Sequence, residues 1–175
     1  MLRLKRIPWF AAFLGALVVF ASSVQARDIG GTISSTLTIT EDSQLVDDVT
    51  CTVVEAACIA FGASGITLDL NGFSMTGLGD AETGCSGGRS GTAERSEDGI
   101  SAAMQRNVTV RGPGLVRRFR AAGFRSDNSS GVTVTGATFS TNCLSGILVG
   151  GGSDHRFEGN IAVGNGNSVS PCGGI

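Results

Sequence analysis

The stretch GITLDLNGFSMTG, residues 65–77, alternates apolar and polar residues and then breaks at Asn71-Gly72. Strict alternation is typical of a half-buried strand, and Asn-Gly between two alternating runs usually indicates a hairpin. The same pattern also suits a corner between two strands of a structure that repeats. The rest of the chain decides between a hairpin and a corner.

An internal repeat of about 23 residues runs through the C-terminal half of the chain. The segments NVTVRG, GVTVTG and DHRFEG begin at residues 107, 131 and 154, and their closing glycines are 24 and 23 residues apart. A second marker, glycine followed by an apolar residue, recurs in step at Gly99, Gly123, Gly146 and Gly174. Two markers with one period predict coils that stack as parallel strands about 4.8 Å apart. Asn71-Gly72 is then a corner within one coil, not a hairpin.

Stacked coils place equivalent residues in columns that run through the core. The expected inward columns are Ile66, Val108 and Val132; Leu68, Val110, Val134 and Phe157; and Ile100, Phe124, Ile147 and Ile175. His155 falls in the first column and is expected to pack there. Asn142 and Asn165 each lie six residues after a turn glycine, so we expect them to form a structural turn ladder at one corner.

The segments ITLDLNGFSMTG, NVTVRG and GVTVTGATFSTN together resemble the right-handed parallel β-helix repeat proteins of the pectin-lyase-like superfamily. The likeness covers residues 62–175, with a strand-rich N-terminal cap segment at 27–61. It implies an all-β, right-handed, single-stranded parallel β-helix with coils of about 23 residues. The superfamily includes polysaccharide lyases, glycoside hydrolases and surface or adhesive proteins, so the fold does not decide the activity.

The two ends of the chain carry separate signals. Residues 1–26 combine a positive start, an apolar run and a final Val24-Gln25-Ala26, which is typical of a signal peptide, with an uncleaved N-terminal anchor as the alternative. After cleavage we expect no stable membrane span and a secreted, periplasmic or cell-surface protein. The chain stops at Ile175 as another Gly-apolar strand begins, so we expect C-terminal coils and their cap to be missing. The open strand edge would then allow self-association.

The cysteines indicate disulfides rather than metal ligands, because an exported chain meets an oxidising environment. Cys143 and Cys172 precede the glycine markers at 146 and 174, which predicts that they pair across adjacent coils. Cys51 and Cys58 enclose six residues and could close a local loop. Cys85 is left without an assigned partner.

Two segments carry most of the charge outside the strands. The Gly/Ser-rich stretch 78–98 holds five acids, interpreted as solvated, with calcium binding as the alternative: Asp80, Glu82, Glu94, Glu97 and Asp98. The stretch VRRFRAAGFR, with the strand before it, supplies five arginines as candidate substrate-binding residues: Arg111, Arg117, Arg118, Arg120 and Arg125. Guanidinium groups bind carboxylates bidentately and so suit an acidic polysaccharide. The alternative pairs these arginines with acids on neighbouring coils, and Asp69–Arg111 is the natural cross-coil pair.

Composition narrows the function without fixing it. Without the three cations of the leader, the net charge is about −5, which argues against general nucleic-acid binding. The sequence favours an exported protein that binds or processes an acidic polysaccharide along its flank, with a non-catalytic surface, adhesive or assembly scaffold as the alternative. Whether it is an enzyme is left open. An enzyme would resemble a polysaccharide lyase, with calcium as its ion, or a glycoside hydrolase, and no catalytic residue or resident cofactor is assigned.

Overall fold

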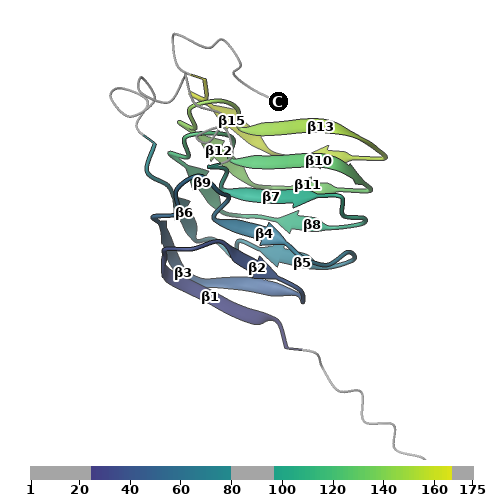
Figure 1. The fold of residues 1–175 in the computed structure, drawn as a ribbon, viewed down its shortest axis with the longest axis horizontal. Coiled ribbons are helices and arrows are strands. Elements are labelled where there is room, and N and C mark those ends of the chain that lie inside the picture. The colour runs from purple at the N-terminus through teal and green to yellow at the C-terminus, as the bar shows by residue number, and fades with distance from the viewer. Residues whose placement is uncertain (1–24, 80–96, 167–175) are drawn as a thin grey trace, which may run out of the picture.

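The structure is a computed structural model that describes residues 25–79 and 97–166, and within these ranges it is built from strands and turns without helices (Figure 1). The strands are β1 (Arg27–Ile33), β2 (Leu37–Ile39), β3 (Ser43–Cys51), β4 (Ile59–Phe61), β5 (Thr67–Asp69), β6 (Ser74–Thr76), β7 (Ile100–Ala103), β8 (Thr109–Arg111), β9 (Leu115–Arg117), β10 (Phe124–Ser130), β11 (Thr133–Thr135), β12 (Thr138–Ser140), β13 (Ile147–Ser153), β14 (Arg156–Glu158) and β15 (Ile161–Val163). The prediction of an all-β chain is therefore confirmed.

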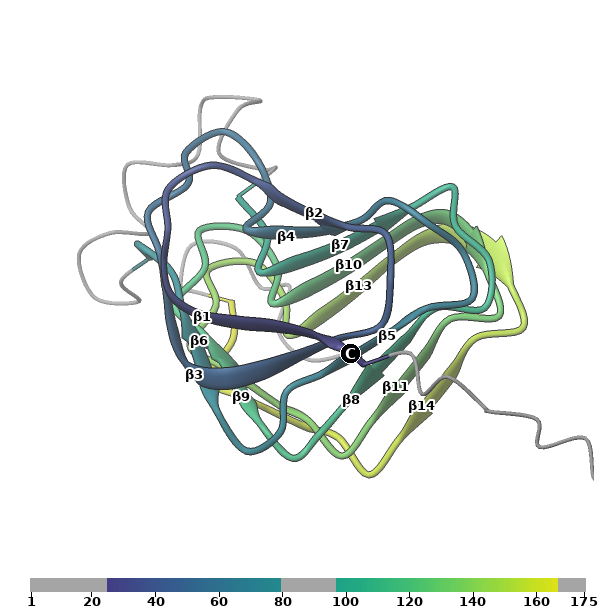
Figure 2. The same cartoon turned by 90° about the horizontal axis from the view of Figure 1, so that it is seen from below.

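All the paired strands run parallel, in two sheets. The ten-stranded sheet has the order β14-β11-β8-β5-β3-β6-β9-β12-β15, with β1 paired to β3, and the five-stranded sheet has the order β13-β10-β7-β4-β2. The larger sheet therefore has two wings that meet at β3 (Figure 2). From β4 onward the chain visits the small sheet, one wing and then the other, and each circuit, here called a coil, stacks on the previous one. Residues 27–61, expected to form a strand-rich segment, contribute β1 to β4.

The Asn71-Gly72 break is a corner. It separates β5 from β6, which lie on opposite wings and pair with β3 rather than with each other. Asn71 and Gly72 both have positive φ, at 48° and 87°, so the chain turns sharply there. The Asn71 side chain donates from Nδ2 to the Leu45 carbonyl on the neighbouring coil, at 3.0 Å. The Asn-Gly signal therefore belongs to the repeat.

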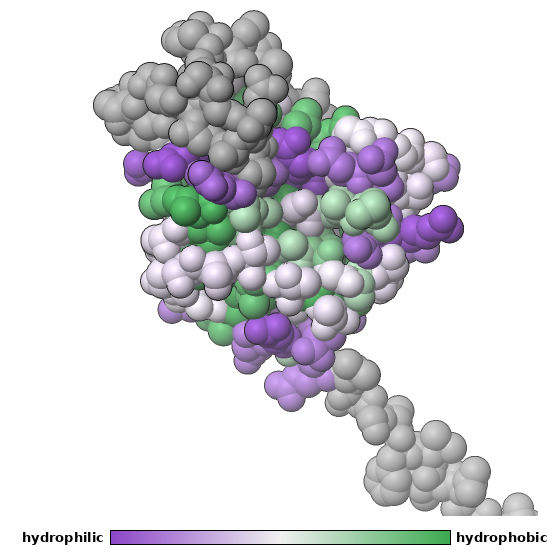
Figure 3. Space-filling model, in the orientation of Figure 1, coloured by the Kyte–Doolittle hydropathy of each residue, from purple (hydrophilic) through white to green (hydrophobic). Residues whose placement is uncertain are grey.

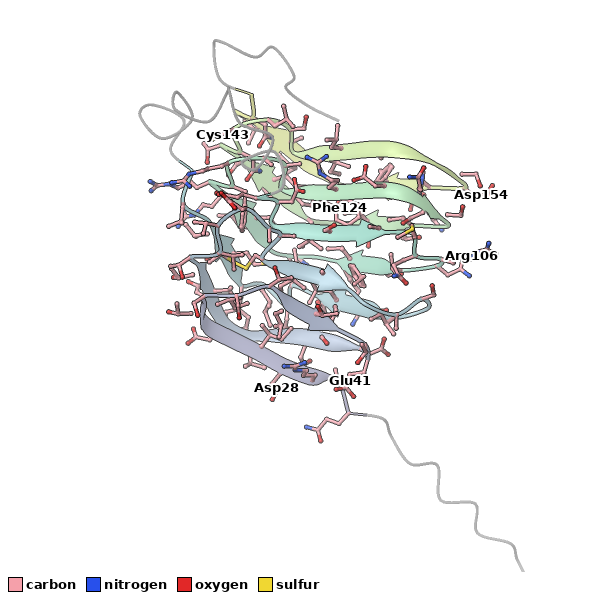
Figure 4. All side chains as sticks on the ribbon, in the orientation of Figure 1. Asp28, Glu41, Arg106, Phe124, Cys143 and Asp154 are labelled. Atoms are coloured by element: carbon pink, nitrogen blue, oxygen red, sulfur yellow. A yellow bond between two sulfur atoms is a disulfide. The ribbon has the colours of Figure 1, made fainter. Side chains whose placement is uncertain are left out.

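The core consists of the inward columns. Leu68 is in register with Val110, Val110 with Val134, and Val134 with Phe157. Phe124, inside the stack in Figure 4, aligns in the same way with the two isoleucines of the neighbouring coils, Ile100 and Ile147. These side chains are buried, except for Phe157 in the last described coil, which is half-buried. The predicted column member Ile175 lies outside the described residues. Half-buried His155 lies beside Phe157, with their ring centroids 6.1 Å apart.

Stacked asparagines hold the corner that follows the second wing. Asn142 Oδ1 accepts the Phe119 backbone N–H at 3.1 Å, and its Nδ2 donates to the Val116 carbonyl at 3.3 Å. Asn165 repeats the arrangement one coil on, accepting from the Asn142 backbone N–H at 3.0 Å and donating to the Phe139 carbonyl at 2.9 Å. Each side chain thus replaces the bonds that the backbone loses where the strands end, and both are buried.

The cysteines are partly placed. Cys51 and Cys58 form a disulfide with their Cα atoms 6.0 Å apart, and this closes the loop between β3 and β4. Cys143 is also disulfide-bonded. Cys172, its predicted partner, and Cys85 both lie outside the described residues, so the pairing of Cys143 with Cys172 stays a prediction.

Replacing Asn142 with Ala should lower the free energy of unfolding by roughly 2–4 kcal/mol, because it strands a buried N–H and a buried carbonyl. The matched control is Asn160→Ala. Asn160 makes the equivalent bonds to the Ala137 N–H and the Val134 carbonyl, at 3.0 and 2.7 Å, but it is only half-buried. Water can replace its bonds, so its loss should be smaller. Equal losses in urea unfolding would show that the Asn142 ladder has no special weight.

Candidate anion-binding site

Arg111 is held by an acid on the neighbouring coil. It is directly in register with Asp69, and its Nη2 lies 2.6 Å from Asp69 Oδ2 on the outer face of the first wing. The Arg111 side chain is 60% exposed, so this is a surface pair whose contribution to stability is small. Its guanidinium group is nevertheless engaged, as the cross-coil alternative expected.

Arg120 and Arg125 hold two buried acids. Arg120 Nη1 lies 3.2 Å from Glu97 Oε2, and Arg125 Nε lies 2.7 Å from Asp98 Oδ2. The two carboxylate side chains are only 5% and 3% exposed. The interpretation of 78–98 as solvated acids is therefore wrong for Glu97 and Asp98. The other three acids of that stretch lie outside the described residues.

Backbone groups complete the surroundings of both carboxylates. Glu97 Oε1 accepts the Glu55 N–H at 3.0 Å, and Asp98 Oδ1 accepts the Ala122 N–H at 2.9 Å. A buried charge is tolerated when it is paired and hydrogen-bonded in this way, and its removal is costly. The acids therefore tie the start of β7 to the disulfide-closed loop and to the next coil.

The adjoining hollow is too small for a sugar. It is bordered by the Cys51–Cys58 disulfide, Glu97, Phe119 and Arg120, and it has room for about one water molecule. Burial raises the pKa of Asp98 to about 6, against the opposing effects of Arg125 and the Ala122 N–H. This perturbed carboxyl is thus a feature of the packed interior, where both of its oxygens are already bonded.

Arg117 and Arg118 differ from the other candidates. Arg117 Nε donates to Thr76 Oγ1 on the neighbouring coil at 3.1 Å, and Arg118 Nε donates to the Gly79 carbonyl at 3.0 Å. Both residues are exposed, and among the described residues neither has a carboxylate within 4.0 Å. Their remaining guanidinium N–H groups can therefore reach an anion from solvent. The five candidate arginines thus divide into three engaged groups and one adjacent exposed pair.

The repeat explains how this pair is presented. Arg117 ends β9 on the outward side of the second wing, in register with Thr76 on one neighbouring coil and Ser140 on the other. Arg118 has φ of 57°, and the equivalent Thr141 and Gly164 also have positive φ, at 52° and 63°. The left-handed residue turns the chain directly after the strand, so two consecutive guanidinium groups lie at one outer corner.

An acid borders the pair on the side of the N-terminal coils. Asp48 Oδ1 accepts the Ser74 N–H at 2.8 Å, and that hydrogen bond lowers the pKa of Asp48 from its ordinary value, with a smaller contribution from the Arg117 charge. Asp48 therefore stays ionised near Arg117. A bound anion is favoured over the corner itself and the coils that follow it, away from Asp48.

Glu97 and Asp98 were missed because the long insertion hides the repeat. Alignment on the glycine marker places Asp98 at the position of Ala122 and Ser145, each of which directly precedes a marker glycine. Both of those residues are buried, so the position before the marker is an interior one. Alignment from Gly99 backwards would have revealed the burial of Asp98.

Across the described ranges, no helix is long and apolar enough to cross a membrane. No family model matches the chain, and the searches of curated proteins and of solved structures returned no match. The outward face of the five-stranded sheet, which carries small residues such as Thr38, Ala60 and Ser101, is mostly pale in Figure 3 and has few charges. Arg117 and Arg118 therefore form the candidate anion-binding site.

Replacing Asp98 with Asn should remove a pH dependence of folding stability. The folded-state pKa of Asp98 is raised from 3.8 to about 6, so the folded protein binds this proton more tightly than the unfolded chain. The stability of the wild type should therefore fall as the pH rises from about 4 to 6, by at most roughly 3 kcal/mol. Urea unfolding of both proteins at several pH values measures the difference. Parallel stability profiles for the two proteins would contradict the assignment.

Proposed function

We propose that the chain is an exported right-handed parallel β-helix of the pectin-lyase-like kind that binds an acidic polysaccharide through Arg117 and Arg118. The parallel strands, which recur in the same order in every coil, support the β-helix, and crossover connections between parallel strands are right-handed in about 98% of cases. The Cys51–Cys58 disulfide supports a secreted, periplasmic or cell-surface location, because such bonds persist in oxidising compartments.

The observation that carries the proposal is the adjacent pair of exposed arginines without a carboxylate partner among the described residues. Arg111, Arg120 and Arg125 are each matched by an acid, so the corner is a local excess of positive charge on an acidic protein. A guanidinium fork pairs with a carboxylate through two parallel hydrogen bonds. Uronate carboxylates offer this group at regular intervals along a glycan chain.

Hydroxyl groups beside the arginines fit a sugar rather than an isolated anion. Thr76 and Ser140 are in register with Arg117 on either side, and the outward position of Ser140 places it next to the guanidinium column. Hydroxyl side chains can both donate to and accept from sugar hydroxyls. The site therefore combines a carboxylate-binding cation with neutral hydrogen-bonding groups on the next coil.

Replacing Arg117 and Arg118 together with Ala should weaken binding of polygalacturonate or alginate by at least about tenfold, because a hydrogen bond to a charged group contributes roughly 1.5–3 kcal/mol. The matched control is Arg111→Ala, which removes an exposed arginine that is already paired. Binding is measured by calorimetry at low and moderate salt, with and without calcium. If the double variant binds as tightly as the wild type, the corner does not hold the glycan.

The calcium arm of that experiment addresses the ion that a lyase-like protein would use. Within the described ranges, no cluster of three or more His, Cys, Asp or Glu side chains could hold a metal ion. The proposal therefore assigns binding to the arginines alone. We expect calcium to weaken it slightly, since the ion competes for uronate carboxylates. A strong requirement for calcium would instead favour a metal-bridged site.

A non-catalytic scaffold remains the second candidate, supported by the corner ladders and the cross-coil pairs. Asn142 and Asn165 tie the coils together at the corner after the second wing, and the Arg111–Asp69 pair bridges two coils on the outer face. Such features stabilise a rod that presents surfaces. Failure of the wild type to bind either glycan would favour this scaffold reading.

A further inference from the structure

The last described coil ends in strands with one open side. Among the described strands, β13 pairs only with β10, β14 only with β11 and β15 only with β12. Figures 1 and 2 place these strands at the end of the stack opposite β1. Apolar side chains are exposed there, with Ile161 at 57% and Val163 at 56%. An uncovered strand edge with apolar neighbours is a surface for strand pairing.

The backbone of β14 is oriented for such pairing. The Arg156 N–H donates to the Val132 carbonyl at 2.8 Å, and the Glu158 carbonyl accepts the Gly136 N–H at 2.9 Å. Hydrogen bonds alternate between the two sides of a strand. The N–H and C=O of Phe157, between these two residues, therefore point to the open side. A strand laid against β14 would bond to Phe157 through both groups.

The side chains of β14 are complementary to themselves when reversed. Arg156 and Glu158 flank Phe157 on the outer face, 65% and 54% exposed, and pair with each other at 2.6 Å. In an antiparallel pair centred on Phe157, the Phe157 residues of two copies lie opposite each other. Arg156 of each copy then faces Glu158 of the other. Opposite charges directly across an antiparallel pair are favourable.

Stacking the copies head to tail would give the opposite result. Asp28 on β1, at the far end of the molecule in Figure 4, aligns through Gln44, Asp69, Arg111 and Thr135 with Glu158. A second copy continuing this register would place Asp28 against Glu158, where like charges repel. The β1–β3 pairing also shifts register between Ile29 and Gly31, and such irregular edges discourage further pairing.

We propose that two copies of this chain associate tail to tail, pairing their β14 strands in antiparallel orientation around a two-fold axis at Phe157. The exposed apolar residues Ile161 and Val163 lie on the same end and extend the contact beyond the strand. Each molecule has one such end, so the association closes at a dimer, whereas head-to-tail stacking would grow without limit. This interface lies at the end of the stack and does not depend on the proposed glycan site.

The test is sedimentation of the purified chain over a wide range of concentrations. The wild type should show a reversible monomer–dimer equilibrium with nothing larger. Arg156→Glu and Glu158→Arg should each weaken dimerisation by about tenfold, because each replaces two attractive pairs with two repulsive ones. The double variant Arg156→Glu/Glu158→Arg should return the dissociation constant to within about threefold of the wild-type value. The matched control is Arg106→Glu, which changes an exposed turn away from the edge and should leave dimerisation unchanged.

Three outcomes would overturn the proposal. A monomer at every concentration excludes the interface, provided that circular dichroism shows the chain folded. Stronger association of Glu158→Arg, with species beyond the dimer, would indicate head-to-tail stacking against Asp28. A double variant as weak as the single ones would show that Arg156 and Glu158 do not face each other across the interface.

Discussion

The structure depends on one constraint, that each coil must place its strands directly above those of the coil before it. Parallel strands share all their inter-strand hydrogen bonds with neighbouring coils, so a slip of one residue would turn every inward side chain outward. The columns from Leu68 to Phe157 and from Ile100 to Ile147 satisfy this condition with apolar residues. The spacing of 23 to 24 residues between equivalent strands follows from it, because longer or shorter circuits would break the register.

The same constraint arranges the charges. Outward residues also form columns, so an acid and an arginine at equivalent positions of adjacent coils become partners, as Asp69 and Arg111 do. An arginine whose column neighbours are Thr76 and Ser140 receives hydrogen bonds but no compensating charge. Arg117 acquires its exposed charge in this way, and the left-handed Arg118 next to it doubles that charge. Ligand binding at the corner is thus a consequence of where the repeat omits an acid.

Much of the fold could be predicted because it is written in the period. Two markers recurring in step were enough to place the inward columns, the Asn71-Gly72 corner and the parallel pairing. The buried state of Glu97 and Asp98 could not be predicted, because the insertion before them interrupts the period and polar residues normally lie in solvent. Which arginines are matched by acids depends on side-chain reach across coils, which separated Arg120 and Arg125 from Arg117 and Arg118. The resemblance to pectin-lyase-like proteins concerned the fold alone and carried no residue of the site.

The measurement that tests the stacked-coil account most directly is a set of nuclear Overhauser contacts in the folded protein. The account predicts methyl contacts from Leu68 to Val110 and from Val110 to Val134, since these side chains are neighbours on successive coils. It predicts no close Hα–Hα contacts between residues 67–69 and 74–76, which lie on opposite wings. Strong Hα–Hα contacts between those two segments, without the methyl contacts, would establish a hairpin at Asn71-Gly72 and contradict the account.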